Sequence, residues 1–213
     1  MKIGIIGSGN IGGSLGSHWA KAGHQVLFSS QHPEQLHSLV KEVGENAKAV
    51  SITEAFEANA DVYLLAVPFY AVGTLAELYA GEYKNKVIID ATNPYPERDG
   101  DIAKDVIKAN YNASEFTAMK FSTASTAKAF NTIKAAHLRD RAFNDFDKLA
   151  IPFAAQDEVS KKLTQKLITD IGFDAVYIGD LTDSSIMDPD KTLYGKSLQR
   201  NELQTLVNTT KTF

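Results

Sequence analysis

The chain has 213 residues and a formal net charge of −4, with 22 basic and 26 acidic side chains. Because acidic residues outnumber basic ones and neither sign forms a run, a surface that follows a nucleic-acid backbone is not expected. The sequence has no cysteine, which excludes disulfides, thiolate nucleophiles and cysteine-ligated metal sites.

Short apolar segments alternate with longer amphipathic ones along the chain. Most of the short segments are apolar on both faces and rich in β-branched or aromatic residues, as strands of a helix-covered parallel sheet must be. This alternation predicts an α/β fold of Rossmann type, a doubly wound, mostly parallel sheet with a small C-terminal cap. No apolar run is long enough to span a membrane or form a signal peptide, so we expect a cytoplasmic protein with no membrane partner. The expected strands are 3–7, 25–29, 47–52, 62–67, 87–91, 127–131, 149–154 and 175–178.

A G-x-G-x-x-G motif follows the first expected strand and opens an amphipathic segment that ends at Gly23. In such a loop the first glycine permits a tight turn, and the second lets the backbone approach a pyrophosphate. The third glycine lets the next helix lie close to the sheet, with its first amides facing the phosphates. A glycine-rich turn without a ligand is the alternative. We expect a dinucleotide against Gly7, Ser8, Gly9, Asn10, Ile11 and Gly12.

The second expected strand ends in Ser29 and Ser30, followed by Gln31 and His32. NAD-binding chains usually place an acidic residue here to accept from the ribose 2′-hydroxyl, and a carboxylate would repel a 2′-phosphate. Hydroxyl and amide groups can donate to a phosphate, and a histidine can add positive charge. This favours NADP(H), although Ser30 could also cap the next helix. The nearby Glu34 and the lack of an arginine leave NAD(H) open.

Three later strands end in residues suited to a ring-binding site. Ligands of open α/β sheets bind beyond the carboxyl ends of the strands. A small apolar wall follows the fourth strand, and an asparagine follows each of the next two. Asn93 and Asn131 could orient a carboxamide or a heterocycle, or each could simply turn its own loop. The cofactor-binding residues expected here are Ala66, Val67, Pro68, Asn93, Ala129 and Asn131.

From about residue 155 the pattern changes. Val159, Leu163, Leu167 and Ile171 recur every four residues and predict a helix over 157–171. A strand, a polar loop and a final amphipathic segment follow. We expect residues 1–155 to form an NADP-binding Rossmann domain. Residues 156–213 would form a small cap or dimerisation segment packed on the same sheet, because they are too few to build a second core.

No spacing of residues indicates a nucleophilic triad or a metal site, and the five histidines are not spaced as metal ligands. Hydride transfer between two bound rings needs little acid–base help, because the protein mainly orients the rings and excludes water. The residues therefore indicate an oxidoreductase that uses NADP(H) and a small-molecule acceptor. A non-catalytic NADP(H)-binding sensor is the alternative.

Five motifs occur in a recognisable order, namely IGIIGSGNIG, LLAVP, DATNP, KAFNTI and LYG. Together they resemble the F420-dependent NADP reductase family, whose coenzyme F420 is a deazaflavin. The chain is also similar to the cytosolic reductase module of membrane ferric reductases. The resemblance implies hydride exchange between NADP(H) and a flavin or deazaflavin co-substrate. It also implies a homodimer in which the C-terminal segments contribute to the partner contact.

The sequence departs from this family in two places. Relatives usually carry Ser-Arg where this chain has Ser30 and Gln31, and often Gly-Gly-Pro where it has Asp190, Lys191 and Thr192. The second segment would border the acceptor pocket, so a common flavin or another acceptor is an alternative to deazaflavin. A small keto or imine reductase begins similarly, but such enzymes build a long helical dimerisation domain, for which this tail is too short.

Overall fold

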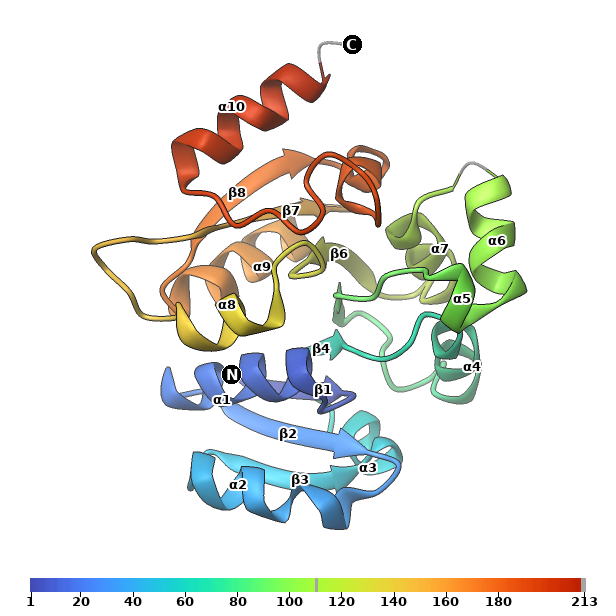
Figure 1. Ribbon diagram of the computed structural model, residues 1–213. Coiled ribbons are helices and arrows are strands. Elements are labelled where there is room, and N and C mark those ends of the chain that lie inside the picture. The colour runs from blue at the N-terminus through green and yellow to red at the C-terminus, as the bar shows by residue number, and fades with distance from the viewer. Residues whose placement is uncertain (110, 212–213) are drawn as a thin grey trace.

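A single eight-stranded sheet runs through the centre of the protein (Figure 1), and the computed structural model describes residues 1–109 and 111–211. The strand order is β3-β2-β1-β4-β5-β6-β7-β8. Neighbouring strands are parallel except β6 and β7, which are antiparallel. The expected Rossmann-type α/β fold with a mostly parallel sheet is therefore confirmed. The strands are β1 (Lys2–Ile6), β2 (Gln25–Ser30), β3 (Ala47–Ser51), β4 (Val62–Leu65), β5 (Val87–Asp90), β6 (Ser125–Ala129), β7 (Ala150–Ala155) and β8 (Asp174–Gly179).

Helices cover both faces of the sheet. Side chains of α1, α2, α8 and α9 pack on one face, and those of α3, α4, α6 and α7 pack on the other. A third cluster joins the 3₁₀ turn η2 and α10 to β7 and β8. The helices are α1 (Asn10–Lys21), α2 (His37–Val43), α3 (Ile52–Glu57), α4 (Ala71–Leu78), α5 (Pro96–Asp99), α6 (Asp101–Lys108), α7 (Ala113–Lys120), α8 (Ala135–Asp140), α9 (Glu158–Asp170) and α10 (Arg200–Lys211), with 3₁₀ turns η1 (Pro33–Leu36) and η2 (Thr182–Met187).

Local signals in the sequence set the ends of the two long helices that were expected. The carboxylate of Asp157 accepts from the Ser160 amide at 2.8 Å, a cap that starts α9. Gly172, at φ +81°, follows the end of α9, and Gly23, at φ +90°, follows the end of α1. Positive φ suits glycine, which is why both helices stop where the sequence predicts.

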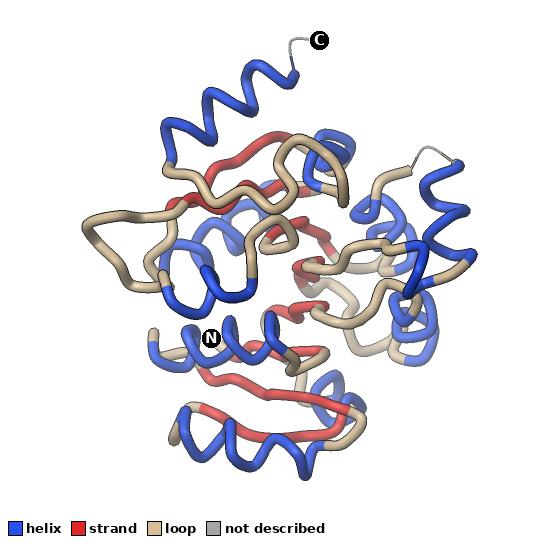
Figure 2. Tube along the Cα trace, viewed as in Figure 1, coloured by secondary structure: helices blue, strands red, loops and turns tan. Residues whose placement is uncertain are grey.

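Three strands beside the candidate ligand-binding residues end earlier than expected, and this moves several of those residues into loops. β6 ends at Ala129 because Phe130 has φ +66°, outside the strand region. Likewise β4 ends at Leu65 and β5 at Asp90. The residues after these strands therefore lie in the loops at the carboxyl edge of the sheet, which Figure 2 shows in tan.

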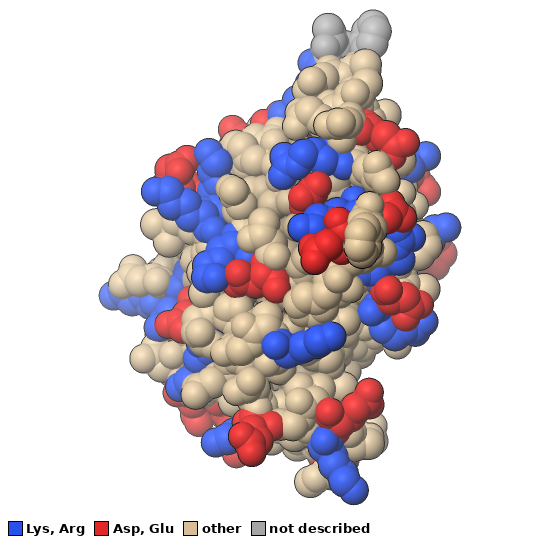
Figure 3. Space-filling model, turned by 90° about the vertical axis from the view of Figure 1, so that its left-hand side faces the viewer, with Lys and Arg blue, Asp and Glu red and all other residues tan. Residues whose placement is uncertain are grey.

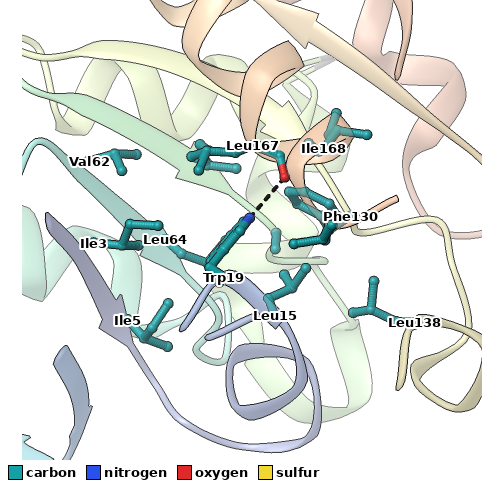
Figure 4. Packing of buried hydrophobic residues seen from close by; sticks show 14 of the residues in the cluster. Ile3, Ile5, Leu15, Trp19, Val62, Leu64, Phe130, Leu138, Leu167 and Ile168 are labelled. Atoms are coloured by element: carbon teal, nitrogen blue, oxygen red, sulfur yellow. Dashed lines mark hydrogen bonds between the residues drawn. The ribbon is translucent and has the colours of Figure 1, made fainter. Parts of the chain in front are cut away.

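The largest buried cluster ties the glycine-loop helix to the C-terminal part of the chain. The indole N–H of Trp19 on α1 donates to the carbonyl of Leu167 on α9 at 2.9 Å (Figure 4). The ring of Phe130 meets Trp19 edge-on, with centroids 5.8 Å apart. α9 comes from the segment expected to form a cap, and it packs in this main core. The turn after β6 is thereby held against α1.

Charges of both signs are spread over the surface. On the face in Figure 3, basic and acidic side chains lie interspersed. Several are paired within one helix, such as Lys161 with Glu158 at 3.0 Å and Lys166 with Asp170 at 2.8 Å. Among the helices of the two described ranges, none is both long and apolar enough to cross a bilayer.

Candidate functional site

The glycine loop between β1 and α1 has the geometry that a bound pyrophosphate requires. Gly7 has φ +96°, and a Cβ there would lie 2.6 Å from the Ala66 carbonyl oxygen. A Cβ on Gly12 would lie 2.0 Å from the carbonyl oxygen of Gly7. A Cβ on Gly9, in contrast, would have no protein atom within 4 Å. The outer two glycines are thus needed for the fold, whereas the middle one leaves space for a ligand.

Backbone amides at the start of α1 are available to a phosphate. No side chain caps the helix at Gly9, and the first amides of a helix have no partner within it. Together with the dipole of this 12-residue helix, they favour an anion at this end. The Ser8 hydroxyl donates instead to the Ser29 carbonyl at 3.0 Å. Contacts to a phosphate would therefore come from the amides of Gly9 to Gly12.

The structure corrects one expectation at the end of β2. Ser29 is fully buried, and its hydroxyl donates to the Ile5 carbonyl at 2.7 Å. A hydroxyl turned into the sheet cannot donate to a ribose 2′-phosphate, so the expectation for the Ser29 side chain is wrong. The strand register pairs Ser29 with Ile6, and Ser29 shapes the site by holding the glycine loop through its carbonyl.

The next three residues keep their candidate role. Gln31 and His32 are exposed, while the half-buried Ser30 accepts from the amide of His32 at 3.1 Å. Ser30 thus closes a turn with His32 ahead of η1, and its hydroxyl hydrogen is left to donate. It does not cap η1, whose N-cap is His32 without a side-chain cap, so the alternative expectation for Ser30 is wrong. The His32 ring lies 3.3 Å from the Glu34 carboxylate, which would compete with a phosphate for this side chain.

A pocket of about 340 Å³ lies beyond the ends of β5 and β6. Ile11 from α1 lines it, with Asn93 and Asn131 from the two loops. In the strand order, β2 lies on one side of β1, whereas β5 and β6, and with them the pocket, lie on the other side. A dinucleotide on the glycine loop could therefore reach from the end of β2 to the pocket, across the position where the strand order reverses.

The apolar wall after β4 lies beside the glycine loop. The Ala66 amide donates to the Ile6 carbonyl at 2.9 Å, and a Cβ on Gly7 would lie 2.8 Å from a methyl carbon of Val67. Ala66, Val67 and Pro68 do not line the pocket itself, and neither does the fully buried Ala129.

Asn93 and Asn131 meet, and their hydrogen bonds give them different roles. The Asn131 side-chain amide donates to Asn93 Oδ1 at 3.0 Å and to the carbonyl of Met187 at 2.8 Å. The Asn93 amide donates to the Asn131 carbonyl at 3.0 Å. Both side-chain N–H groups of Asn131 thus have acceptors, whereas its side-chain oxygen has no protein partner. Asn93 therefore orients Asn131.

Buried oxygen atoms without a protein partner lie on the loops after β5 and β6. Within the described residues, Asn131 Oδ1 and the hydroxyls of Thr92 and Thr132 are buried and accept or donate no hydrogen bond. A buried polar group left unpaired costs roughly 1–3 kcal/mol. A ligand that brings an N–H donor, such as a primary carboxamide, would remove this cost at Asn131. Phe130, held in a left-handed conformation next to Asn131, is the kind of strained residue that accompanies functional sites.

A buried ion pair supports the turn after β5, and sequence reasoning missed it. Lys128 Nζ lies 3.1 Å from Asp90 Oδ2, and both side chains have no exposed surface. Burial raises the pKa of the nearby Asp188 carboxyl, which faces the charges of Lys128 and Asp90. The available signal was a lysine in an otherwise apolar strand. No group of three His, Asp or Glu side chains in residues 1–109 and 111–211 could hold a metal ion.

The C-terminal segment completes the pocket. Tyr194, from the LYG motif, lines it and hydrogen-bonds through its hydroxyl to the hydroxyl of Tyr95, which follows β5. The Met187 carbonyl, at the end of η2, accepts from Asn131. The sequence motif marked Tyr194, whereas nothing in the sequence marked Tyr95 as its partner.

Comparison with known proteins gives one family and several relatives. Residues 2–94 match the model of the family described as NADP oxidoreductase, coenzyme F420-dependent. The F420-dependent NADP reductase of Methanothermobacter thermautotrophicus is 33% identical over 149 residues, which cover 65% of this chain and 64% of that protein. Metalloreductase STEAP3 of Rattus norvegicus is 26% identical over 134 residues, which cover 63% of this chain and 25% of that protein.

A solved structure extends the similarity to nearly the whole fold. A hypothetical protein from Sinorhizobium meliloti superposes with a TM-score of 0.81, at 24% identity, over 94% of this chain and 96% of that chain. At this identity the likeness establishes the fold alone. The chain spans a quarter of one curated relative and less than two thirds of the other.

Proposed function

Because the chain is a relative of the coenzyme F420-dependent NADP oxidoreductases, we propose that it is an NADPH-dependent oxidoreductase. It transfers hydride between NADP(H) and a small flavin-like acceptor, which is a deazaflavin, a flavin or a related ring. One spatial relation carries the proposal. The glycine loop lies between a strand end without a carboxylate, at β2, and a pocket with an unpaired amide oxygen, beyond β6.

The residues of the loop and the strand ends would each hold one part of the cofactor. The amides of Gly9 to Gly12 bind the pyrophosphate, for which the open space at Gly9 leaves room. Ser30, Gln31 and His32 face the 2′-phosphate of the adenosine ribose. Asn131 Oδ1 accepts from the nicotinamide carboxamide, and Asn93 keeps the Asn131 side chain in place.

Bound NADPH supplies a hydride, and the protein supplies orientation and the exclusion of water. The pocket of about 340 Å³ is at the small end of the roughly 300–1,000 Å³ that ligand pockets usually have. Its walls combine the apolar Ile11 with the rings of Tyr95 and Tyr194, a lining suited to a flat acceptor. The proposal includes a cytoplasmic homodimer, which light scattering on the purified protein and cell fractionation would test.

Calorimetric titration with NADPH and with NADH tests the cofactor part of the proposal. We expect NADPH to bind at least tenfold more tightly, and equal affinity or tighter NADH binding would contradict it. NADPH oxidation measured spectrophotometrically with FMN, riboflavin, deazaflavin and a quinone tests the reaction. Tight NADPH binding without oxidation by any of these acceptors would instead favour a sensor.

A further inference from the structure

Two tyrosines from distant parts of the chain form one wall of the pocket. Tyr95 and Tyr194 lie 99 positions apart, and their hydroxyls are hydrogen-bonded. Both rings line the pocket and are half-buried. The Arg98 guanidinium lies over the Tyr95 ring, 4.8 Å from its centroid. The hydroxyls are thus held at the pocket, although hydride transfer as described above does not use them.

The Tyr95 phenol keeps its proton at neutral pH. Burial raises its pKa most, the hydrogen bond and proximity to Tyr194 raise it further, and Arg98 and Asn93 lower it by less. A phenol of this kind is a hydrogen-bond donor and not a base. The pair therefore brings two O–H groups to the pocket wall.

Counting hydrogens shows that one of the two is free. Two phenols have two O–H hydrogens, and the contact between them uses one. Either hydroxyl can be the donor in this contact. When Tyr95 donates to Tyr194, the hydrogen of Tyr194 is free to enter the pocket. The hydroxyl of Tyr194 can then donate to a bound ligand.

We infer that Tyr194 donates a hydrogen bond to the heteroatom of the acceptor that becomes negative as the hydride arrives, and that Tyr95 positions Tyr194. This inference rests on the proposed function. In the transfer, a C–H bond of NADPH breaks with both electrons, a new bond forms at the acceptor ring, and NADP⁺ is left. The charge gained by the acceptor falls on a carbonyl oxygen or ring nitrogen, which the Tyr194 hydroxyl stabilises before a solvent proton neutralises it.

The substrate class follows from this role. A donor that acts only on developing negative charge selects acceptors with a carbonyl or ring nitrogen conjugated to the reacting atom, such as flavins, deazaflavins and quinones. A ferric chelate, which takes single electrons, has no such atom. The role of Tyr194 therefore agrees with the flavin-like acceptor of the proposed function.

A purely structural role does not account for the tyrosine pair, because other bonds already hold the C-terminal segment. The Asn112 amide donates to the Leu181 carbonyl at 2.8 Å, and the hydroxyls of Ser114 and Ser184 are 2.7 Å apart. Leu193, next to Tyr194, is fully buried in the cluster on β7 and β8. The segment that leads to Tyr194 is therefore anchored at Leu181, Ser184 and Leu193 without the two hydroxyls.

Tyr194→Phe and Tyr95→Phe test the inference, with Tyr177→Phe as the matched control on β8. Each variant is titrated with NADPH by calorimetry, and NADPH oxidation is then followed with FMN and with a quinone. For Tyr194→Phe we expect kcat to fall roughly 10²-fold, the loss typical of removing one such donor, while NADPH affinity stays within twofold of the wild type. For Tyr95→Phe we expect a smaller fall in kcat and a higher KM for the acceptor.

The outcomes separate this inference from the proposed function. If the wild type oxidises NADPH with these acceptors and Tyr194→Phe keeps a kcat within twofold, the assignment of Tyr194 is wrong and the proposed function stands. If Tyr194→Phe also loses NADPH affinity or unfolds at lower temperature, the hydroxyl is structural and the assignment is overturned. If the wild type binds NADPH but reduces no acceptor, the assignment of Tyr194 and the proposed function are both wrong. A loss of kcat in Tyr177→Phe as large as in Tyr194→Phe would also contradict the assignment.

Discussion

The ammonium group of Lys128 on β6 lies 3.1 Å from the carboxylate of Asp90 on β5, and neither side chain has any exposed surface. Lys128 also donates to the Thr92 carbonyl at 2.5 Å, and Asp90 accepts from the Thr92 amide at 2.8 Å. The pair therefore fixes both polar groups of the peptide chain at Thr92, the residue before Asn93. A buried charge pair thus supports the turn that orients Asn131.

Removing one charge of this pair should destabilise the fold. For Lys128→Met we expect the free energy of unfolding to fall by roughly 3–5 kcal/mol, because Asp90 would remain as an unpaired buried charge. The double variant Lys128→Met, Asp90→Asn should recover much of this loss, since no net charge is left. Urea denaturation measures both. Lys104→Met, which breaks the exposed pair with Asp101, is the control and should change stability by less than about 1 kcal/mol. A comparably small change in Lys128→Met would contradict the expectation.

Substitution by alanine should have different effects at Gly9 and Gly12 of the glycine loop. Gly9→Ala should fold with a melting temperature close to that of the wild type, because its Cβ meets no protein atom within 4 Å. Its affinity for NADPH should fall at least tenfold, since the methyl group occupies the position of the pyrophosphate. Gly12→Ala should lose folding stability itself, because its Cβ would lie 2.0 Å from the Gly7 carbonyl oxygen. Thermal unfolding and calorimetry distinguish the two effects. Wild-type affinity in Gly9→Ala would rule out this placement of the phosphates.

Adjacent serines at the end of β2 should also differ. Ser30→Asp should shift the ratio of NADPH to NADH affinity by at least about tenfold towards NADH, because a carboxylate repels the 2′-phosphate. Ser29→Asp should instead lower the free energy of unfolding by several kcal/mol, since it places a charge where the side chain is fully buried. Calorimetry with both cofactors and urea denaturation provide the readouts. An unchanged affinity ratio in Ser30→Asp would show that the ribose lies elsewhere.

Stability should fall as the pH drops below about 6.5, the usual pKa of histidine. Burial lowers the pKa of His18, which lies against the Leu138 carbonyl, and of His24, where burial outweighs the Asp170 carboxylate. The unfolded chain therefore binds protons at these histidines at a higher pH than the folded protein does. The stability is present above pH 6.5 and is lost as the pH falls towards the folded pKa values.

Urea denaturation between pH 7.5 and pH 5 tests this dependence. The double variant His18→Gln, His24→Gln should show a shallower loss over the same range, while the exposed His37, changed to Gln, serves as the control. A wild-type stability that rises on acidification would contradict the expectation.

Local features of the sequence were sufficient for the sheet, the glycine loop and the long helices. Backbone conformation and side-chain volume decide whether a position needs glycine, and this could be read at Gly7 and Gly12 before any contact was known. Hydrophobic periodicity predicted α1 and α9 because it depends on neighbours three and four positions away. The positions of the apolar segments likewise placed polar candidates for ligand binding, such as Asn93 and Asn131, at or after the ends of strands.

Tertiary structure alone decided what those candidates do. Ser29 faces the sheet because of its pairing with β1. Asn93 and Met187 accept from the two side-chain N–H groups of Asn131, while its oxygen has no protein partner. Lys128 meets Asp90 across 38 positions of the chain, and Tyr95 meets Tyr194 across 99. Such partners are brought together by packing of the whole sheet with its C-terminal segment. A sequence pattern shows which polar groups are present. Which of their atoms remain without a hydrogen-bond partner depends on neighbours that only the complete fold brings close.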